Sequence, residues 1–281
     1  MTGVQLARWG DPFPAKQPEV SAYTFDNDDP AAAERLRLSS AVLDGFTASR
    51  LSSLGDLTGR RCLEVGAGNG SIAGWLADQA GSSGQVLATD INTRHIPPDR
   101  GYTIVRHDLT GDPLPDGPWD LIHARLVLRH LPGRHDILRR LATTLAPGGA
   151  LAIEEWDAYR AGLVLAAPEP EAAELFYAYE TIIEQLVDAH AVDLDWPWQV
   201  HAAMAGAGLV DVDTAVYARS WPGGSAGALH QAATISLLRP RLLEAGMDGE
   251  QLDRLSGFLR DPRMVVRGLL TVSTVGRRPG S

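Results

Sequence analysis

From Arg60 onward, short apolar runs alternate with segments in which apolar residues recur every three or four positions. The first pattern predicts buried strands, and the second predicts helices that pack on a sheet. Their alternation along the chain is typical of a doubly wound parallel sheet, so the sequence predicts an α/β fold with seven mostly parallel strands. The predicted strands are residues 61–65, 85–90, 102–107, 119–124, 150–154, 209–217 and 268–275.

Helical spacing predicts the elements between and around these strands. An acidic pair before Pro30 favours a helix start, with a helix over residues 32–49 and a second short one over 49–54. Further helices are predicted at residues 72–77, 136–145, 169–190, 198–205, 227–245 and 249–259. We expect one domain, composed of an N-terminal helical cap (1–57), a core (58–157), a helical lid insertion (158–207) and a C-terminal part of the sheet with helices (208–281).

Three glycines at alternate positions, Gly66, Gly68 and Gly70, separate the first strand from the first helix of the core. Glycine lets the backbone turn tightly and approach a ligand, which the first helical N–H groups then face. A dinucleotide fingerprint would need G-x-G-x-x-G, but here the third slot is Ser71. Glu64 would repel a pyrophosphate and suits a ligand with a cationic end. These two residues disfavour a nicotinamide oxidoreductase.

The stretch from Glu64 to Gly70 resembles motif I of the class I S-adenosylmethionine-dependent methyltransferases, E/D-x-G-x-G-x-G. The resemblance covers residues 60–157 and extends more loosely to the C-terminal Gly-Arg-Arg-Pro, as in actinobacterial methyltransferases of natural-product pathways. It implies a Rossmann-like fold, S-adenosyl-L-methionine as the cofactor and residues 58–157 as the cofactor-binding core. The motif I residues that it places at the cofactor are Glu64, Gly66, Ala67, Gly68, Gly70 and Ser71.

Two later strand ends extend the resemblance. Asp90 ends the second strand, where a carboxylate can accept from both ribose hydroxyls, and Ile91 follows it. After the third strand the family pattern matches His107, Asp108 and Leu109. It implies that Asp108 accepts from the adenine amino group and that Leu109 packs on the ring. A helix-capping or solvated role remains open for either acid.

The fourth strand ends in Ala124 and Arg125, a position whose backbone lines the methionine end of the cofactor in the family. Arg125 is predicted to pair either with the cofactor carboxylate or with Glu64. A cofactor-binding role for both residues is therefore implied by the resemblance.

Four residues are candidates for the chemistry itself. Several small-molecule methyltransferases have a histidine at the position of His130, and a neutral imidazole can take a proton from the acceptor. Glu154 and Glu155 end the fifth strand and point to opposite faces, so one of them is predicted to reach the cleft. Tyr23 is an aromatic candidate. Each of these residues also fits an ordinary structural role.

The predicted reaction is metal-independent methyl transfer to a small acceptor, because no cluster of metal ligands is evident. C-methylation of an indole-like ring, with a carboxylate or histidine base, is the first choice. O- or N-methylation of a phenol or amine stays open, and so does a non-methylating cofactor-binding role.

The composition and charge of the chain disfavour some classes of binding partner. The chain has 281 residues and a formal net charge of −10, and it shows no basic stripe or basic amphipathic segment, so neither nucleic acid nor a membrane is an expected partner. Cys62 is the single cysteine, which excludes an internal disulfide. No secretion signal or long apolar span is read, so we expect a cytoplasmic enzyme, monomeric or homodimeric.

Overall fold

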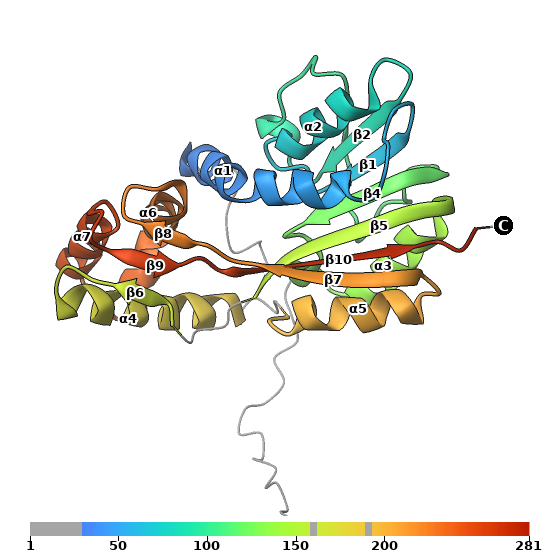
Figure 1. Cartoon of the computed structure of the whole chain (residues 1–281). Coiled ribbons are helices and arrows are strands. Elements are labelled where there is room, and N and C mark those ends of the chain that lie inside the picture. Colours follow the sequence, from blue (N-terminus) through green and yellow to red (C-terminus); the bar gives the residue numbers. More distant parts are fainter. Residues whose placement is uncertain (1–29, 158–161, 189–192, 281) are drawn as a thin grey trace, which may run out of the picture.

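The computed structural model describes residues 30–157, 162–188 and 193–280 (Figure 1). Within these residues, seven strands form the main sheet in the order β3-β2-β1-β4-β5-β10-β7. Strands β1 to β5 pair in parallel, and β10 runs antiparallel to both of its neighbours. The predicted Rossmann-like α/β fold is thereby confirmed. The strands are β1 (Arg61–Val65), β2 (Gln85–Asp90), β3 (Thr103–Arg106), β4 (Trp119–Arg125), β5 (Leu145–Asp157), β7 (Val210–Tyr217) and β10 (Leu270–Arg277).

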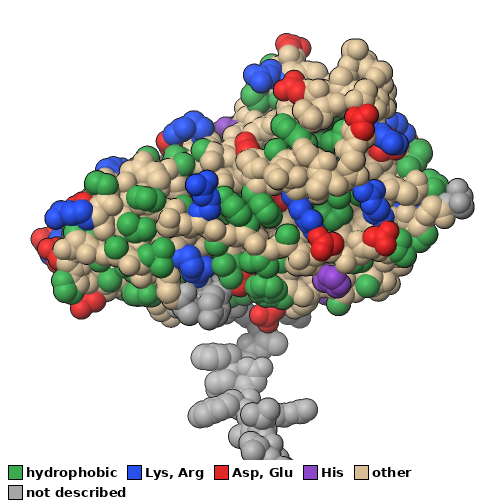
Figure 2. All heavy atoms as spheres, viewed as in Figure 1, with side chains coloured by type: hydrophobic (Ala, Val, Ile, Leu, Met, Phe, Trp, Pro, Cys, Tyr) green, Lys and Arg blue, Asp and Glu red, His purple; other side chains and the backbone are tan. Residues whose placement is uncertain are grey.

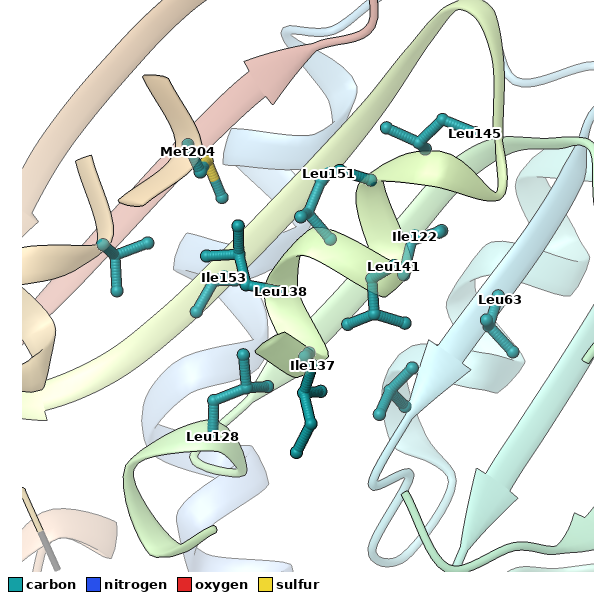
Figure 3. Packing of buried hydrophobic residues seen from close by; sticks show 14 of the residues in the cluster. Leu63, Ile122, Leu128, Ile137, Leu138, Leu141, Leu145, Leu151, Ile153 and Met204 are labelled. Atoms are coloured by element: carbon teal, nitrogen blue, oxygen red, sulfur yellow. The ribbon is translucent and has the colours of Figure 1, made fainter. Parts of the chain in front are cut away.

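Helices cover both faces of the main sheet because its strands are apolar runs, whose successive side chains point to opposite faces. One face packs against α3 (Arg134–Thr143) and α5 (Trp196–Gly206) through a cluster that includes Leu63, Ile122, Leu138 and Met204 (Figure 3). The opposite face packs against α1 (Pro30–Ser52) and α2 (Ser71–Ala80), where the core includes Leu51, Cys62, Leu76, Leu121 and Ala152. Two 3-10 turns, η1 (Thr93–His95) and η2 (Leu128–His130), follow β2 and β4.

A second group of elements, which we call the helical lobe (residues 162–188 and 220–267), lies beside the main sheet (Figure 1). It contains a three-stranded sheet and its own apolar core. Trp221 is central to it, because a Cβ at Gly227 or Gly268 would come within 2.1 or 2.5 Å of the indole. Its elements are β6 (Val164–Ala166), α4 (Pro170–Asp188), β8 (Ser220–Pro222), α6 (Ala226–Glu244), α7 (Gly249–Phe258) and β9 (Val265–Arg267).

The structure differs from the sequence prediction in three respects. The small sheet was not predicted, because three-residue strands are too short to show a period of two. Helix α1 continues to Ser52 without the predicted break at Ser49. Helix α5, predicted within the lid insertion, packs instead on the main sheet through the buried side chains of Trp196 and Val200.

No helix in the described part of the chain is long and apolar enough to span a bilayer. On the face shown in Figure 2, acidic and basic side chains are interspersed over both the main-sheet region and the helical lobe. That face therefore carries no continuous basic patch of the kind that tracks a nucleic-acid backbone.

Candidate active site

The strand order reverses between β1 and β4, so their carboxyl ends flank a topological switch point. Ligands of open α/β sheets bind at such a point, outside the carboxyl ends of the strands. The glycine turn after β1, the acid at the end of β2 and the loop after β4 all lie at this edge.

The three glycines of the turn have φ values of 66°, 60° and 74°, the left-handed region that costs other residues energy. At Gly66 the turn is also tightly packed, since an added Cβ would lie 2.3 Å from Cγ2 of Val127. Ala67 donates its N–H to the carbonyl of Thr89 at 2.9 Å, which fastens the turn to β2. Gly70 is the N-cap of α2 and offers no side-chain cap, although the Ser71 N–H donates to Oδ1 of Asn69 at 3.3 Å, so the helix N-terminus is only partly satisfied within the chain.

Asp90 braces this turn. Its Oδ2 accepts from the Gly68 N–H at 2.8 Å, and its Oδ1 accepts from the Asn92 N–H at 2.9 Å. Burial raises the pKa of Asp90, and these backbone N–H groups oppose the shift. An ionised carboxylate has about four acceptor positions, and the N–H groups of Gly68, Ile91 and Asn92 act on this one, so capacity remains for a ribose hydroxyl. Ile91, directly after it, is 56% exposed, which fits an apolar contact with a bound ring.

The residues predicted at the adenine have partners within the chain. Asp108 Oδ1 accepts from the N–H and the hydroxyl of Thr110, at 2.9 and 2.6 Å, and these bonds lower the pKa of Asp108. His107 Nε2 donates to the Pro113 carbonyl at 3.0 Å. Leu109 is buried in the sheet core. Asp108 and His107 shape the loop, and adenine recognition by this segment stays a prediction.

Arg125 does not form the predicted pair with Glu64. Its guanidinium lies 2.8 Å from Oδ1 of Asp44 and donates to the hydroxyl of Thr47 at 2.9 Å, both on α1. Ala124, the preceding residue, is fully buried on the opposite face. Glu64 instead lies 2.7 Å from Nδ1 of His123. The alternative pairing of Arg125, with a cofactor carboxylate, stays a prediction.

His123 joins Glu64 to Glu154 on the face that α1 covers. The Nε2 atom of His123 lies 3.6 Å from Oε2 of Glu154, which accepts from the Thr47 hydroxyl at 2.5 Å. Burial alone would lower the pKa of His123, but Glu64 and Glu154 together raise it to about 9. The same contact with His123 lowers the pKa of Glu154 against the effect of burial. At neutral pH the arrangement is therefore an imidazolium between two carboxylates.

Helix α1 extends this network to the glycine turn. Ser71 donates to Asp44 at 3.2 Å, and Ser40 contacts the hydroxyl of Ser71 and Oδ1 of Asn69, each at 3.0 Å. None of these α1 residues was predicted from the sequence. Their signal is the spacing of residues 40, 44 and 47, which places three polar side chains on one face of a helix.

The second glutamate of β5 lies on the opposite face, as strand alternation predicts, yet both glutamates are at most 1% exposed, so neither carboxylate reaches solvent. Glu155 Oε1 accepts from the Arg129 N–H at 3.1 Å, and Oε2 has no hydrogen-bond partner among the described residues. Burial raises the pKa of Glu155 to about 7, although the Arg129 charge and the backbone N–H groups of Arg129, Leu128 and Val127 act against it. His130, in η2, has its pKa lowered to about 3, mainly by burial and by the charge of Arg129. Tyr23 lies outside the described residues.

Leu126, between Arg125 and Val127, has a positive φ of 59°, which was not predicted from the sequence. Such a conformation costs about 1–3 kcal/mol and is concentrated at functional sites. Its N–H donates to the Glu154 carbonyl at 2.8 Å, which holds the strained turn against β5. Among the described residues, no group of three or more His, Cys, Asp or Glu side chains is arranged to hold a metal ion.

The doubly wound sheet, the glycine turn at its switch point and the carboxylate that braces the turn define a class I S-adenosyl-L-methionine-dependent methyltransferase. The chain belongs to the methyltransferase-domain family, whose model matches residues 36–207. S-adenosyl-L-methionine is accordingly its cofactor, and the close-packed glycine turn, Asp90 and exposed Ile91 fit that molecule.

Similarity to individual curated proteins is confined to part of the chain. Over 101 residues it is 39% identical to the methyltransferase str2 of Strobilurus tenacellus, covering 35% of this chain and 36% of that protein. Over 109 residues it is 32% identical to the ubiquinone/menaquinone biosynthesis C-methyltransferase UbiE of Azotobacter vinelandii, covering 35% and 43%. The matched segment thus spans less than half the length of these relatives. They are a fungal and a bacterial protein, and the finer actinobacterial resemblance is not shown by them.

Solved structures share the fold at low sequence identity. A proposed methyltransferase from Bacillus halodurans has a TM-score of 0.53 and 17% identity, over 83% of this chain and 98% of that one. A protein from Anabaena variabilis, described as a proposed methyltransferase from an antibiotic biosynthesis pathway, has a TM-score of 0.53 and 14% identity, over 84% and 98%. These similarities support the fold and do not identify an acceptor.

Proposed function

We propose that the protein transfers a methyl group from S-adenosyl-L-methionine to a carbon of a small, electron-rich aromatic acceptor, with an indole-like ring as the first choice. The observation that carries this proposal is Glu155, a buried carboxyl at the carboxyl end of β5 with one oxygen that has no hydrogen-bond partner among the described residues. Carbon methylation of an aromatic ring requires a group that removes a ring proton. The UbiE relatives, named as C-methyltransferases, support the same class of reaction.

The bound cofactor supplies an activated methyl group on a sulfonium ion. Asp90 and the glycine turn would fix the ribose part of the cofactor and so help to align the methyl group, and alignment of reacting groups can supply about 7–11 kcal/mol. Bound there, S-adenosyl-L-methionine would supply its methyl group to the ring carbon, and the electron pair of the broken sulfur–methyl bond would stay on sulfur. The ring must then lose one proton, which Glu155 accepts. A general base of this kind contributes about 10²–10⁴-fold.

The three described candidates for the base differ in how well their surroundings support that role. A base acts best when its pKa lies near the working pH, which matches Glu155 at about 7. Glu154 is committed to His123 and Thr47, and its lowered pKa makes it a weaker base. His130, with a pKa of about 3, is neutral at physiological pH but holds a proton poorly.

O- or N-methylation of a phenol or amine is the second candidate function, and a non-methylating cofactor-binding role is the third. The test is incubation of the protein with methyl-labelled cofactor and indole, phenol or amine acceptors, followed by mapping of the labelled atom. Label on a ring carbon supports the proposal. Label only on oxygen or nitrogen replaces it with the second candidate, and cofactor binding with no transfer to any acceptor supports the third.

The predictions about partners and location stay predictions. A small-molecule acceptor suits a site at strand ends, and an acidic chain is not expected to bind nucleic acid or a membrane surface. The cytoplasmic location and a monomeric or homodimeric state are tested by fractionation and by sedimentation.

A further inference from the structure

His230 is a buried polar residue that the site described above does not use. It lies on α6, in the helical lobe, and is 4% exposed. Neither Nδ1 nor Nε2 has a hydrogen-bond partner among the described residues. A neutral imidazole carries one donor and one acceptor, and buried groups of this kind are nearly always satisfied. A ligand that forms a hydrogen bond with one of the two ring nitrogens would satisfy part of this missing hydrogen bonding.

Two polar neighbours of His230 along α6, Gln231 and Thr234, are already committed to other groups. Gln231 accepts from the Tyr179 hydroxyl at 3.1 Å and donates to Glu180 at 3.2 Å. The Thr234 hydroxyl donates at 2.9 Å to the backbone carbonyl of His230, not to its ring. The deficit at the imidazole therefore persists when the surrounding hydrogen bonds are formed.

His230 also lies beside the catalytic end of the main sheet. Its ring packs edge-on against Trp156, with centroids 5.2 Å apart, and Trp156 directly follows Glu155 in β5. The Trp156 indole is held in place by a 3.1 Å bond from its Nε1 to Thr271. Arg35 of α1 acts electrostatically on both His130 and His230, so the two histidines approach the same part of α1.

We propose that His230 is the polar anchor of the acceptor subsite, which lies between α1, α6 and the end of β5. The ligand is a planar aromatic molecule with one ring N–H or hydroxyl, which bonds to an imidazole nitrogen while the ring packs beside Trp156. This inference rests on the proposed aromatic acceptor. It also places the polar contact of the acceptor, on α6, outside residues 36–207, the part that the chain shares with its family.

The location explains how a shared cofactor site can serve a particular acceptor. The glycine turn and Asp90 lie within the matched residues, whereas α6, β8 and β9 lie beyond them. Recognition of the acceptor by His230 would thus be a property of the helical lobe, and recognition of the cofactor a property of the main sheet.

The test measures binding instead of turnover, using the full chain saturated with S-adenosyl-L-homocysteine. Calorimetry compares two pairs of similar shape: indole with indene, and 2-naphthol with naphthalene. The wild type should prefer the polar member of each pair, and His230→Phe should weaken binding of that member by about fivefold or more. Binding of the hydrocarbons should stay within about twofold, because they do not need the imidazole.

Stability provides a second readout that a structural role would not reproduce. Removing two unsatisfied nitrogens should leave the melting temperature of His230→Phe unchanged or raise it, even as binding weakens. His230→Gln, which keeps a donor and an acceptor, should retain most of the preference for the polar ligand of each pair. If His230→Phe does not fold, a loss of this preference in His230→Gln would contradict the inference. His201→Phe, the same change at an exposed histidine on α5, is the matched control.

Equal changes for all four ligands, no change for any of them, or no binding of any to the wild type would overturn the inference. Failure of the proposed function is distinguishable from these outcomes. If the wild type transfers no label to any acceptor but still shows the preference that depends on His230, the acceptor subsite stands and the methylation of an aromatic carbon does not.

Discussion

The imidazole Nδ1 of His123 lies 2.7 Å from Oε2 of Glu64, with both side chains buried beneath α1. This pair explains how an acid at the start of the glycine turn can be tolerated in the core. From this pair the polar contacts continue through Glu154 to Thr47 on α1. One polar network therefore connects the glycine turn to the N-terminal helix.

Stability should fall with rising pH because of His123. Its pKa is raised to about 9, above the value of about 6.5 in an unfolded chain, so its contribution is complete below pH 6.5 and is lost as pH rises to 9. We expect the free energy of unfolding to drop by about 2–3 kcal/mol across this range. Urea denaturation at pH 7 and 9 measures the drop, to which Glu155, with a pKa of about 7, adds only the last part of its own titration.

The variant His123→Gln should lose this slope and should be about 3–5 kcal/mol less stable at pH 7, since it leaves two buried carboxylates without their cation. If the wild type and the variant lose stability in parallel between pH 7 and 9, the imidazolium assignment is wrong.

Asp90→Ala should weaken cofactor binding by about 1.5–3 kcal/mol, or roughly 10- to 150-fold, the scale of a lost hydrogen bond to a charged group. The reason is its place beneath the glycine turn, where it accepts from Gly68. Calorimetry with S-adenosyl-L-homocysteine measures the effect. Asp78→Ala, at an exposed position of α2, is the control. Unchanged affinity in Asp90→Ala would remove this carboxylate from the cofactor site.

Gly66→Ala and Gly68→Ala form a matched pair at similar positive φ. At Gly68 a Cβ meets only Leu36 at 3.5 Å, so we expect a loss of about 1–2 kcal/mol of stability from the backbone alone. At Gly66 the contact of 2.3 Å with Val127 should add about 1–3 kcal/mol. Chemical denaturation measures both variants. Adding Val127→Ala should rescue part of the Gly66→Ala defect but none of the Gly68→Ala defect, and equal rescue of the two would contradict the packing argument.

Much of this architecture could be predicted from the sequence, because local periodicity encodes it. The apolar run that ends at Val65 and the glycines that follow gave both the strand and the turn. The position of Asp90 followed in the same way from the end of a periodic strand. Such features depend on neighbouring residues only.

The rest depends on contacts between distant parts of the chain. His123 meets Glu64 across 59 positions, and Trp156 meets His230 from another lobe, so no local pattern reports either contact. The same limit explains why Glu64, one of the two partners predicted for Arg125, is replaced by Asp44, 81 positions away. Spacing predicts which face of an element a residue occupies, but not which partner covers that face.

Glu155→Gln should lower kcat by about 10²–10⁴-fold and leave the affinity for the cofactor unchanged, because the variant keeps the oxygen that accepts from Arg129 but cannot take a proton. The wild-type rate should rise with pH through about 7 and then level off, as the carboxyl loses its proton. In Glu155→Gln the rate should not show this rise with pH. Glu154→Gln serves as the comparison and should mainly reduce stability. Full turnover in Glu155→Gln would leave alignment alone to explain the reaction.

Ligand binding should slow hydrogen exchange in the helical lobe and not in α5. The lid insertion predicted from the sequence, residues 158–207, contains both α4 and α5, and this experiment tests the two helices separately. Trp196, Val200 and Met204 bury α5 against the main sheet, so its exchange already reflects the stability of that sheet. Helices α4 and α6 belong to the lobe that carries His230, and ordering an acceptor there should protect them. Exchange with S-adenosyl-L-homocysteine alone, and then with indole added, separates the two effects: the first should protect the glycine turn, and the second should extend protection to α4 and α6. Protection confined to α5, or equal exchange in the lobe with and without indole, would show that this lobe does not close over the acceptor.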